Sequence, residues 1–308
     1  MRRTLKQAAE FRGVGLHGGQ PVQMTIHPDF EARGIRFIRV DVDREIGEIR
    51  AHYELVSDTR LCTNLTNGHG VSVGTVEHVM AALSGSGVTD AVIRLDGPEV
   101  PIMDGSAIDF VREIRRVGLH DLSARAMAMK ILKPVVVEKD GKRAAILPDN
   151  RFEMEFTISF ADPAIGEQTH STILSGGAFI DELADCRTFG HLAEVEHLRH
   201  IGLARGGGLE NAIVVDSGRV LNPEGLRRPD EFVRHKMLDA VGDLALAGCP
   251  IIDRYVGVKA GHEMTNMLLR ALFADPDAWV LMEMPESVTL DARLGMVPEM
   301  LEDQQVAV

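Results

Sequence analysis

The segment Phe232–Asp243 carries the pattern in this sequence that points most directly to chemistry. It places His235, Asp239 and Asp243 at positions i, i+4 and i+8, and on a helix that spacing stacks an imidazole and two carboxylates along one stripe. Lys236 lies on the flank of the same stripe. An imidazole and a carboxylate one turn apart can bind the same metal ion. The competing interpretation is a solvated polar face, which is the commoner use of such a stripe.

Two further places in the chain bring titratable groups to the ends of expected elements. Glu77 and His78 are adjacent in what should be the first turn of a helix. No His-Glu-x-x-His motif is present, so the familiar zinc protease patterns do not apply. An acidic residue in a first turn is also simply favoured by the helix dipole. His262 follows Gly261 between an expected strand and an expected helix, where catalytic groups are often displayed.

A second histidine cluster offers an alternative set of ligands. His197 and His200 are three residues apart, and His191 precedes them. This spacing can also hold a metal. Mixed charges surround these histidines, however, which favours an exposed helix face. We therefore expect the metal site elsewhere.

Metal-assisted hydrolysis is the chemistry that the first set of groups could perform. Three protein ligands with one open position form the pattern of a catalytic zinc site. We expect His78, His235 and Asp239 to be those ligands. Glu77 would then be the base that takes the proton from water at the metal.

His262 and Asp243 would complete this set. His262 would be a charged group that faces the oxyanion or the leaving nitrogen. Asp243 would orient the His262 ring without contacting the substrate itself. The spacing alone does not require these residues to meet, because they come from distant parts of the chain. The elements that carry them therefore matter.

The first part of the chain reads as strands followed by helices. Residues 14–60 alternate apolar and polar side chains, which predicts strands of an antiparallel sheet. A helix should then run from Gly74-Thr75 to about Ser84, with Thr75 as its N-cap. A strand at Ala91–Leu95 and a helix from about Ser106 to Val117 follow.

After Asp121–Met129, which has no clear period, the same order of elements begins again. The expected elements are strands at Val135–Glu138, Arg143–Leu147 and Phe152–Ser159, a helix at Val233–Leu246, a strand at Tyr255–Lys259 and a helix at about Met264–Leu272. The stretches that begin at Glu77 and Arg234 also resemble each other. We therefore predict an α+β fold of two domains of like topology, residues 1–124 and 125–308, in which His78 and His235 occupy related positions.

One stretch interrupts the second domain. Residues 176–212 contain an amphipathic run, Leu192–Ile201, and the sequence Gly206-Gly-Gly208. This predicts an inserted subdomain with its own helix. The glycines are not a phosphate-binding P-loop, because no Gly-Lys-Ser/Thr follows them. They serve either as a flexible turn or as a place where a ligand approaches the backbone closely.

Composition limits the class of protein. The chain has 308 residues, 45% hydrophobic and 26% charged, as in a globular protein. The formal charge of −13 argues against a broad nucleic-acid surface. No apolar run is long enough to span a bilayer, and the first residues lack the apolar core of a secretory signal. Three scattered cysteines give no disulfide framework, so we expect a cytoplasmic protein.

Several motifs, in order along the chain, carry a resemblance to a known family. They are Gly13-Val-Gly-Leu-His17, Thr75-Val-Glu-His78, Pro101-Ile-Met-Asp-Gly-Ser106, Arg187-Thr-Phe-Gly190, Phe232-Val-Arg-His-Lys-Met-Leu-Asp239 and Gly261-His262. Over nearly its whole length the chain resembles the UDP-3-O-acyl-N-acetylglucosamine deacetylases, zinc amidohydrolases of bacterial lipid A synthesis. The resemblance implies an active site between two domains of like topology, with the ligands, base and His262–Asp243 pair named above. It further implies that Thr188 hydrogen-bonds the oxyanion and that Lys236 lies at the substrate.

The same resemblance implies a set of substrate-binding residues. The insertion would form a passage for an acyl chain, and Phe160 and Phe189 would contact the sugar–nucleotide part. Lys142 and Lys259 would lie near the diphosphate. The remaining members of the set are Cys62, Leu192, Glu194, Val195, Gly207, Gly208, Leu209 and Val214. His191 and Glu194 differ from the residues common in the family at these places, which bears on acyl-chain preference.

The resemblance implies hydrolysis of the N-acetyl group of UDP-3-O-(3-hydroxyacyl)-N-acetylglucosamine, with release of acetate. The cofactor would be one catalytic Zn²⁺ per chain, although Fe²⁺ accepts the same ligands. We expect a monomer that binds this UDP-linked sugar, binds no nucleic acid and does not insert stably into membranes. Two other functions stay open: a metal hydrolase for a different acyl amide, and a binding module that has kept only the fold.

Overall fold

The first half of the chain forms a five-stranded mixed sheet whose strands are buried on one face. A computed structural model describes residues 1–174 and 177–284. In the second strand of this sheet Val22, Met24 and Ile26 are buried and alternate with more exposed residues, as expected for a sheet packed on one side. In spatial order the strands are β2 (Ala9–Val14), β3 (Pro21–Pro28), β9 (Ala91–Leu95), β4 (Ile35–Arg39) and β5 (Glu48–Arg50).

The second half repeats this sheet with the same topology. In spatial order its strands are β12 (Val135–Lys139), β13 (Lys142–Leu147), β19 (Arg254–Val258), β14 (Glu153–Ser159) and β15 (Glu167–Ile173). In both sheets the last strand along the chain enters the centre, pairing parallel on one side and antiparallel on the other. The predicted α+β fold of two units of like topology is confirmed.

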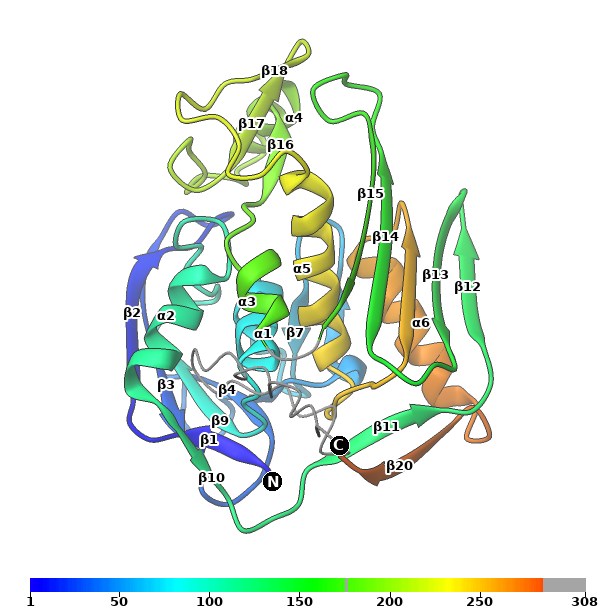
Figure 1. The fold of residues 1–308 in the computed structure, drawn as a ribbon. Helices are drawn as coiled ribbons and strands as arrows, with labels where there is room; N and C mark the ends of the chain where they lie inside the picture. The colour runs from blue at the N-terminus through cyan, green and yellow to red at the C-terminus, as the bar shows by residue number, and fades with distance from the viewer. Residues whose placement is uncertain (175–176, 285–308) are drawn as a thin grey trace, which may run out of the picture.

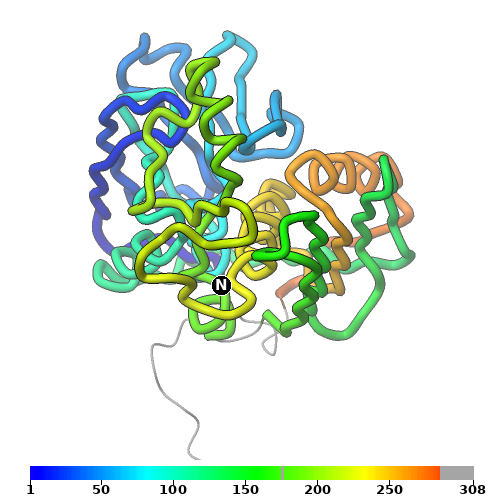
Figure 2. The backbone as a smooth tube through the Cα atoms, turned by 90° about the horizontal axis from the view of Figure 1, so that it is seen from above, coloured from blue at the N-terminus to red at the C-terminus, as the bar shows by residue number. Residues whose placement is uncertain are grey.

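Four long helices occupy equivalent places in the two halves. They are α1 (Glu77–Gly85) and α2 (Ile108–Val117) in the first half, and α5 (Glu231–Ala245) and α6 (His262–Ala274) in the second. Helices α1 and α5 pack against each other at the centre of the molecule, between the two sheets (Figure 1). Seen from above, the two halves form neighbouring lobes (Figure 2). One hydrophobic core runs through both of them.

Each half also carries a three-stranded sheet. In the first half the 3₁₀ turn η1 (Tyr53–Leu55) leads into β6 (Val56–Asp58), β7 (Asn64–Thr66) and β8 (Ser72–Val73). In the second half the predicted insertion contains α3 (Ala178–Glu182), β16 (Phe189–His191) and α4 (Leu192–His200), and β17 (Ile213–Asp216) and β18 (Arg219–Val220) follow it. Its sheet continues beyond Ala212 to Val220, and its predicted start at Gly176 lies outside the described residues.

Two short antiparallel pairs lie where the halves join. Strand β1 (Arg3–Leu5) pairs with β10 (Leu119–Asp121), and β11 (Met127–Ile131) pairs with β20 (Trp279–Glu283). The segment 121–129, expected to be without regular structure, therefore contributes residues to two strands. The domain boundary after residue 124 stays a prediction, and the end of the second domain at Val308 lies outside the described residues.

The predicted start of the first helix was wrong. Helix α1 begins at Glu77 and not at Thr75, and its N-cap position, Val76, makes no side-chain cap. The Thr75 hydroxyl instead donates a 2.9 Å hydrogen bond to Oε1 of buried Glu99. The backbone φ angle of Thr75 is 56°. As an N-cap this hydroxyl would accept a hydrogen bond from a backbone N–H; here it donates to a carboxylate, and a charged partner strengthens a hydrogen bond.

The other predicted helices are close to the observed ones. The one expected from about Ser106 begins at Ile108, and the one expected from about Met264 begins two residues earlier, at His262. No helix among the described residues is both long enough and apolar enough to cross a membrane.

Candidate metal centre

Helices α1 and α5 approach each other closely because α5 has a glycine where they meet. A Cβ atom at Gly242 would collide with the backbone carbonyl of Glu77. With no side chain at Gly242, the first turn of α1 lies directly against the C-terminal half of α5. Side chains from these two helices can therefore share one site.

Three buried side chains converge at this crossing, as the sequence predicted for the ligands. His78 comes from α1, and His235 and Asp239 come from α5. Their ligand atoms all lie within 4.8 Å of one another. The Asp239 Oδ1 atom is 3.5 Å from His78 Nε2 and 3.3 Å from His235 Nε2. Among the described residues this is the one group of three or more potential ligands that lies so close together.

The state of these atoms fits a metal ion. Asp239 Oδ1 is buried and has no hydrogen-bond partner, although buried polar atoms are normally paired. The Nδ1 atom of His235 lies 3.0 Å from the Cys186 carbonyl oxygen, which fixes the proton there and leaves the Nε2 lone pair free. Burial lowers the pKa of His235 to about 4, so its ring is neutral. Two imidazoles and a carboxylate are a donor set that Zn²⁺ accepts.

The polar stripe of α5 is thus not a solvated face. His235, Asp239 and Asp243 are each no more than 4% exposed, because α1 and α6 cover them. Lys236 donates a 2.6 Å hydrogen bond to Asp239 Oδ2, whereas His78 and His235 lie at Oδ1. Burial alone would raise the pKa of Asp239, but His235 and Lys236 outweigh it and hold that pKa well below its ordinary value.

A second buried group of side chains lies beside the three ligands. The His262 Nε2 atom is 3.8 Å from Glu77 Oε1 and 4.0 Å from Asp239 Oδ2. Its Nδ1 atom is 2.8 Å from Asp243 Oδ2. The structure therefore brings together all six residues that the sequence grouped for metal-assisted hydrolysis.

The environment drives two of these groups toward their protonated forms. Burial raises the pKa of Glu77, and the positive charge of His262 opposes the rise. For His262, burial alone would lower the pKa, but the carboxylates of Asp243 and Glu77 outweigh it and raise it to about 9. A carboxylate that can hold a proton and a cationic imidazole are the groups that acid–base catalysis uses.

Thr188 belongs to a segment that is held firmly against the start of α5. Its backbone N–H donates to Gly105, and its carbonyl accepts from Ile213. The preceding residue, Arg187, is buried and bonds the Glu231 carboxylate through its backbone N–H and its guanidinium. No hydrogen bond of the Thr188 hydroxyl is found among the described residues.

The aromatic residues expected at the substrate form one cluster. The rings of Phe160 and Phe189 are 5.5 Å apart, and Phe189 lies 6.2 Å from the His235 ring. His191 joins them at 6.2 Å from Phe160. The cluster connects the metal centre with the insertion.

The insertion residues expected to line a passage differ in exposure. Val214 is buried, Leu192 and Val195 are half-buried on α4, and Leu209 and Glu194 are exposed. Gly207 and Gly208 lie in the turn that follows α4, and a Cβ atom at Gly207 would touch the Leu16 side chain of the first half.

The remaining predicted residues lie at two places. Lys142 and Lys259 are exposed next to the paired residues Arg143 and Val258, so they lie at the same end of two neighbouring strands. Cys62 is buried beside the metal centre. Burial and the charge of Glu77 raise the pKa of its thiol to about 12.

The alternative histidine cluster does not form a metal site among the described residues. His197 and His200 are exposed on α4, and α4 has no buried residue. They do not meet the three-ligand geometry that His78, His235 and Asp239 satisfy. Mixed charge around these histidines indicated this outcome.

Thr63 was not predicted from the sequence, and no role was predicted for Glu231. Thr63 donates hydrogen bonds from its backbone to Glu77 and from its hydroxyl to Asp243. It lies in a loop with no motif, and only its position next to Cys62 hinted at the site. Arg187 lies within a motif that we had identified, but its buried partner Glu231 could not be found from spacing.

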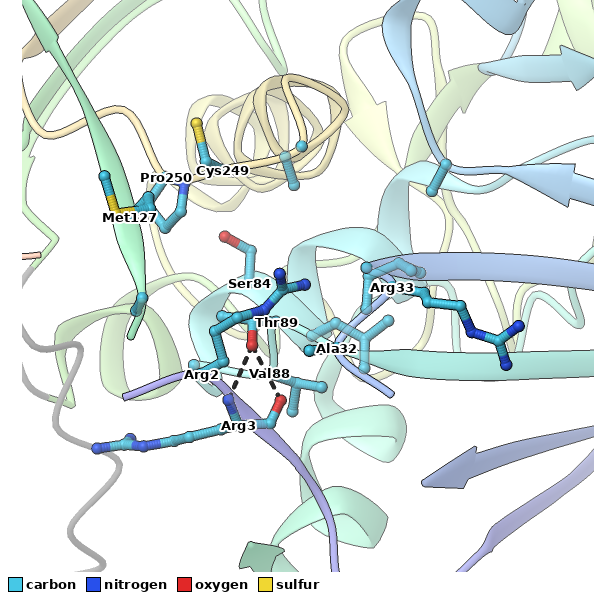
Figure 3. Close-up of a pocket in the computed structure, with 18 of the residues that line it drawn as sticks. Arg2, Arg3, Ala32, Arg33, Ser84, Val88, Thr89, Met127, Cys249 and Pro250 are labelled. Atoms are coloured by element: carbon cyan, nitrogen blue, oxygen red, sulfur yellow. Dashed lines mark hydrogen bonds between the residues drawn. The ribbon is translucent and has the colours of Figure 1, made fainter. Parts of the chain in front are cut away.

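A cavity of about 390 Å³ lies at the C-terminal ends of α1 and α5, away from the metal centre. Leu83 and Ala245 line it, together with Arg2, Thr89 and Cys249, three of the residues labelled in Figure 3. None of the residues predicted for the site lines this cavity. Four of its five arginines are ion-paired with carboxylates outside the lining: Arg2 with Asp90, Arg3 with Asp121, Arg33 with Asp29 and Glu31, and Arg125 with Glu283.

Comparisons with known proteins point to one family. Residues 2–274 match the LpxC family, described as UDP-3-O-acyl N-acetylglycosamine deacetylase. Three proteins named UDP-3-O-acyl-N-acetylglucosamine deacetylase illustrate the similarity. The one from Phenylobacterium zucineum is 52% identical over 276 residues, which is 90% of this chain and 94% of that protein. One from Neisseria meningitidis is 46% identical over 93% of this chain and 94% of its own length, and one from Legionella pneumophila is 46% identical over 90% and 91%.

Proposed function

This chain belongs to the UDP-3-O-acyl-N-acetylglucosamine deacetylases, the zinc-dependent enzymes of lipid A biosynthesis, and from that membership we propose how its residues act. We propose that it hydrolyses the acetamide of UDP-3-O-(3-hydroxyacyl)-N-acetylglucosamine and releases acetate. The single observation that carries the proposal is the buried group of His78, His235 and Asp239, in which an unpartnered carboxylate oxygen faces two imidazoles.

An amide is a poor electrophile, so the site must supply both a nucleophile and a way to polarise the carbonyl. Zinc, held by His78, His235 and Asp239, would supply a water of lowered pKa and Lewis acidity toward the carbonyl. Lys236 keeps Asp239 ionised by bonding Oδ2, while Oδ1 faces His78 and His235. His235 stays neutral, as a ligand must, because of its burial.

Proton transfer falls to two side chains. Glu77 would accept the proton of the attacking water, since its Oε1 atom faces the site and its raised pKa lets it hold that proton. The nitrogen must be protonated to leave. His262, kept cationic by Asp243, would stabilise the developing charge and give this proton, or Glu77 would return the one it took.

The proposed contacts with the rest of the substrate follow the surface from the metal centre outward. The Thr188 hydroxyl would donate to the oxyanion, and Phe160 and Phe189 would contact the sugar–nucleotide part. Lys142 and Lys259 would contact the diphosphate. The acyl chain would pass along the insertion and the site wall, against Cys62, Leu192, Glu194, Val195, Gly207, Gly208, Leu209 and Val214.

We propose one catalytic ion per chain, because one group of ligands is found among the described residues. Zn²⁺ is the expected metal, and Fe²⁺ accepts the same ligands. We further propose that the protein is cytoplasmic and acts as a monomer. Sedimentation analysis of the purified chain would check the monomeric state.

A substrate panel tests the proposal. Purified protein should hydrolyse UDP-3-O-(3-hydroxyacyl)-N-acetylglucosamine far faster than UDP-N-acetylglucosamine, which lacks the acyl chain, and faster than the acylated sugar without UDP. Because binding energy from remote parts of a substrate is used in the transition state, both truncations should lower kcat/KM. Equal rates on all three compounds would instead indicate a hydrolase for another acyl amide. Metal binding without activity on any of them would contradict the proposal.

A further inference from the structure

Thr63 reaches into the site from a loop that none of the sequence motifs covers. It lies just before β7 and is 1% exposed. Its carbonyl oxygen accepts a 3.4 Å hydrogen bond from the backbone N–H of Val76, immediately before α1. The loop is thereby fixed to the start of the helix that carries Glu77 and His78.

The two donors of Thr63 bind two different carboxylates. Its backbone N–H donates to Glu77 Oε2 at 3.0 Å. Its hydroxyl donates to Asp243 Oδ1 at 2.6 Å, across 180 positions of sequence and from one half of the molecule to the other. Both bonds are buried and have a carboxylate as acceptor, which makes them stronger than neutral hydrogen bonds.

In each carboxylate the second oxygen is left to face His262. Glu77 Oε1 lies 3.8 Å from His262 Nε2, and Asp243 Oδ2 lies 2.8 Å from His262 Nδ1. One residue thus fixes the orientation of the proposed base and of the group that orients the proposed acid. We propose that Thr63 is a positioning residue that holds Glu77 and the Asp243–His262 pair at a set separation during deacetylation.

This inference rests on the proposed function, because it assigns Thr63 to the proton-transfer groups of that reaction. The hydroxyl can be tested apart from the backbone. Thr63→Val keeps the shape of the side chain and the backbone N–H to Glu77 but removes the donor to Asp243. Thr63→Ser keeps that donor and removes only a methyl group.

We expect Thr63→Val to lower kcat by about ten- to a hundredfold, since small misplacements of catalytic groups have effects of this order. The KM and the zinc content should stay at their wild-type values, and Thr63→Ser should recover most of kcat. A crystal structure of Thr63→Val should show Asp243 in a changed or a second rotamer.

The matched control is Thr4→Val, which removes another fully buried threonine hydroxyl, one that accepts a hydrogen bond from the Asp29 backbone N–H in the first half. Its kcat should be unchanged.

A double-mutant cycle separates positioning from a general loss of stability. In an Asp243→Ala background Thr63→Val should reduce kcat no further, because the partner of the hydroxyl is already gone. Full independent effects, or a wild-type kcat for Thr63→Val in an active enzyme, would overturn this inference alone. A wild-type protein with no activity on the acylated UDP-sugar would overturn the proposed function and this inference with it.

Discussion

At the scale of single residues, environment gives similar carboxylates different roles. Asp239 lies beside Lys236 and two imidazoles, and its pKa is held low, as a metal ligand requires. Glu77 is equally buried but, among the described residues, accepts a hydrogen bond only from the Thr63 backbone N–H, and its pKa is raised. Asp243 has a hydroxyl on one oxygen and an imidazole on the other. The assignment of ligand, base and orienting group follows from these neighbours and not from residue type.

The role of Glu77 predicts a separation between metal binding and catalysis. Glu77→Ala should keep its zinc, because Glu77 is not among the three ligands, and should lose kcat by on the order of 10²–10⁴-fold. Zinc analysis and steady-state kinetics on the same preparation measure both. Glu263→Ala is the control, since this exposed carboxylate beside His262 forms an ion pair with Lys139. Near-normal kcat in Glu77→Ala would exclude it as the base.

The raised pKa of His262 predicts the alkaline side of the pH profile. The folded-state pKa of about 9 lies above the ordinary 6.5, so the ring is cationic at neutral pH and loses its proton as the pH rises. Activity that needs the cation should therefore fall on the alkaline side. Asp243→Asn removes one stabilising charge, so its alkaline limb should move to lower pH. An unchanged limb in kcat against pH would show that another group titrates there.

At the scale of elements, helix α5 could be predicted from the sequence, because its polar residues recur at a spacing of one turn and its apolar residues fall on another face. The same spacing could not say that α1 would cover the polar stripe. That contact depends on Gly242, whose lack of a side chain admits the Glu77 backbone. It could not reveal Thr63 either, because a loop residue that bonds across 180 positions leaves no local pattern. The metal ligands were predictable as residues, and the contacts that orient them were not.

The close crossing of α1 and α5 predicts that α5 tolerates no side chain at position 242. Gly242→Ala should lower the free energy of unfolding by about 1–3 kcal/mol, as overpacking does, and should also weaken zinc binding, because His78 must move with α1. Thermal or denaturant unfolding and metal titration measure the two effects. Gly68→Ala is the control, because a Cβ atom there meets nothing within 4 Å. Wild-type stability in Gly242→Ala would contradict the close approach.

At the scale of the whole molecule, duplication explains how the site arises. Two sheets with the same strand order each present a helix to the centre, α1 from one half and α5 from the other. The site needs both, because His78 belongs to one and Asp239 to the other. The insertion in the second half, with α4 and its small sheet, lies next to this centre through Phe189 and His235. Neither half alone contains the three ligands.

The insertion predicts that substrate length can be probed separately from chemistry. Leu209→Trp fills part of the proposed acyl passage with a larger ring, so it should lower kcat/KM on a long-chain substrate by on the order of tenfold. A substrate with a truncated acyl group should be affected much less. Leu132→Trp, at an exposed leucine immediately after β11, is the control. Equal losses on both substrates would argue against an acyl passage at Leu209.

The measurement that tests the central claim most directly is metal content together with deacetylase activity, before and after chelation, for wild type and Asp239→Ala. The site predicts about one zinc per wild-type chain, activity that disappears on chelation and returns with zinc, and neither metal nor activity in Asp239→Ala. An enzyme that stays active without metal, or an Asp239→Ala variant that keeps its full zinc, would contradict the assignment of His78, His235 and Asp239 as the catalytic metal site.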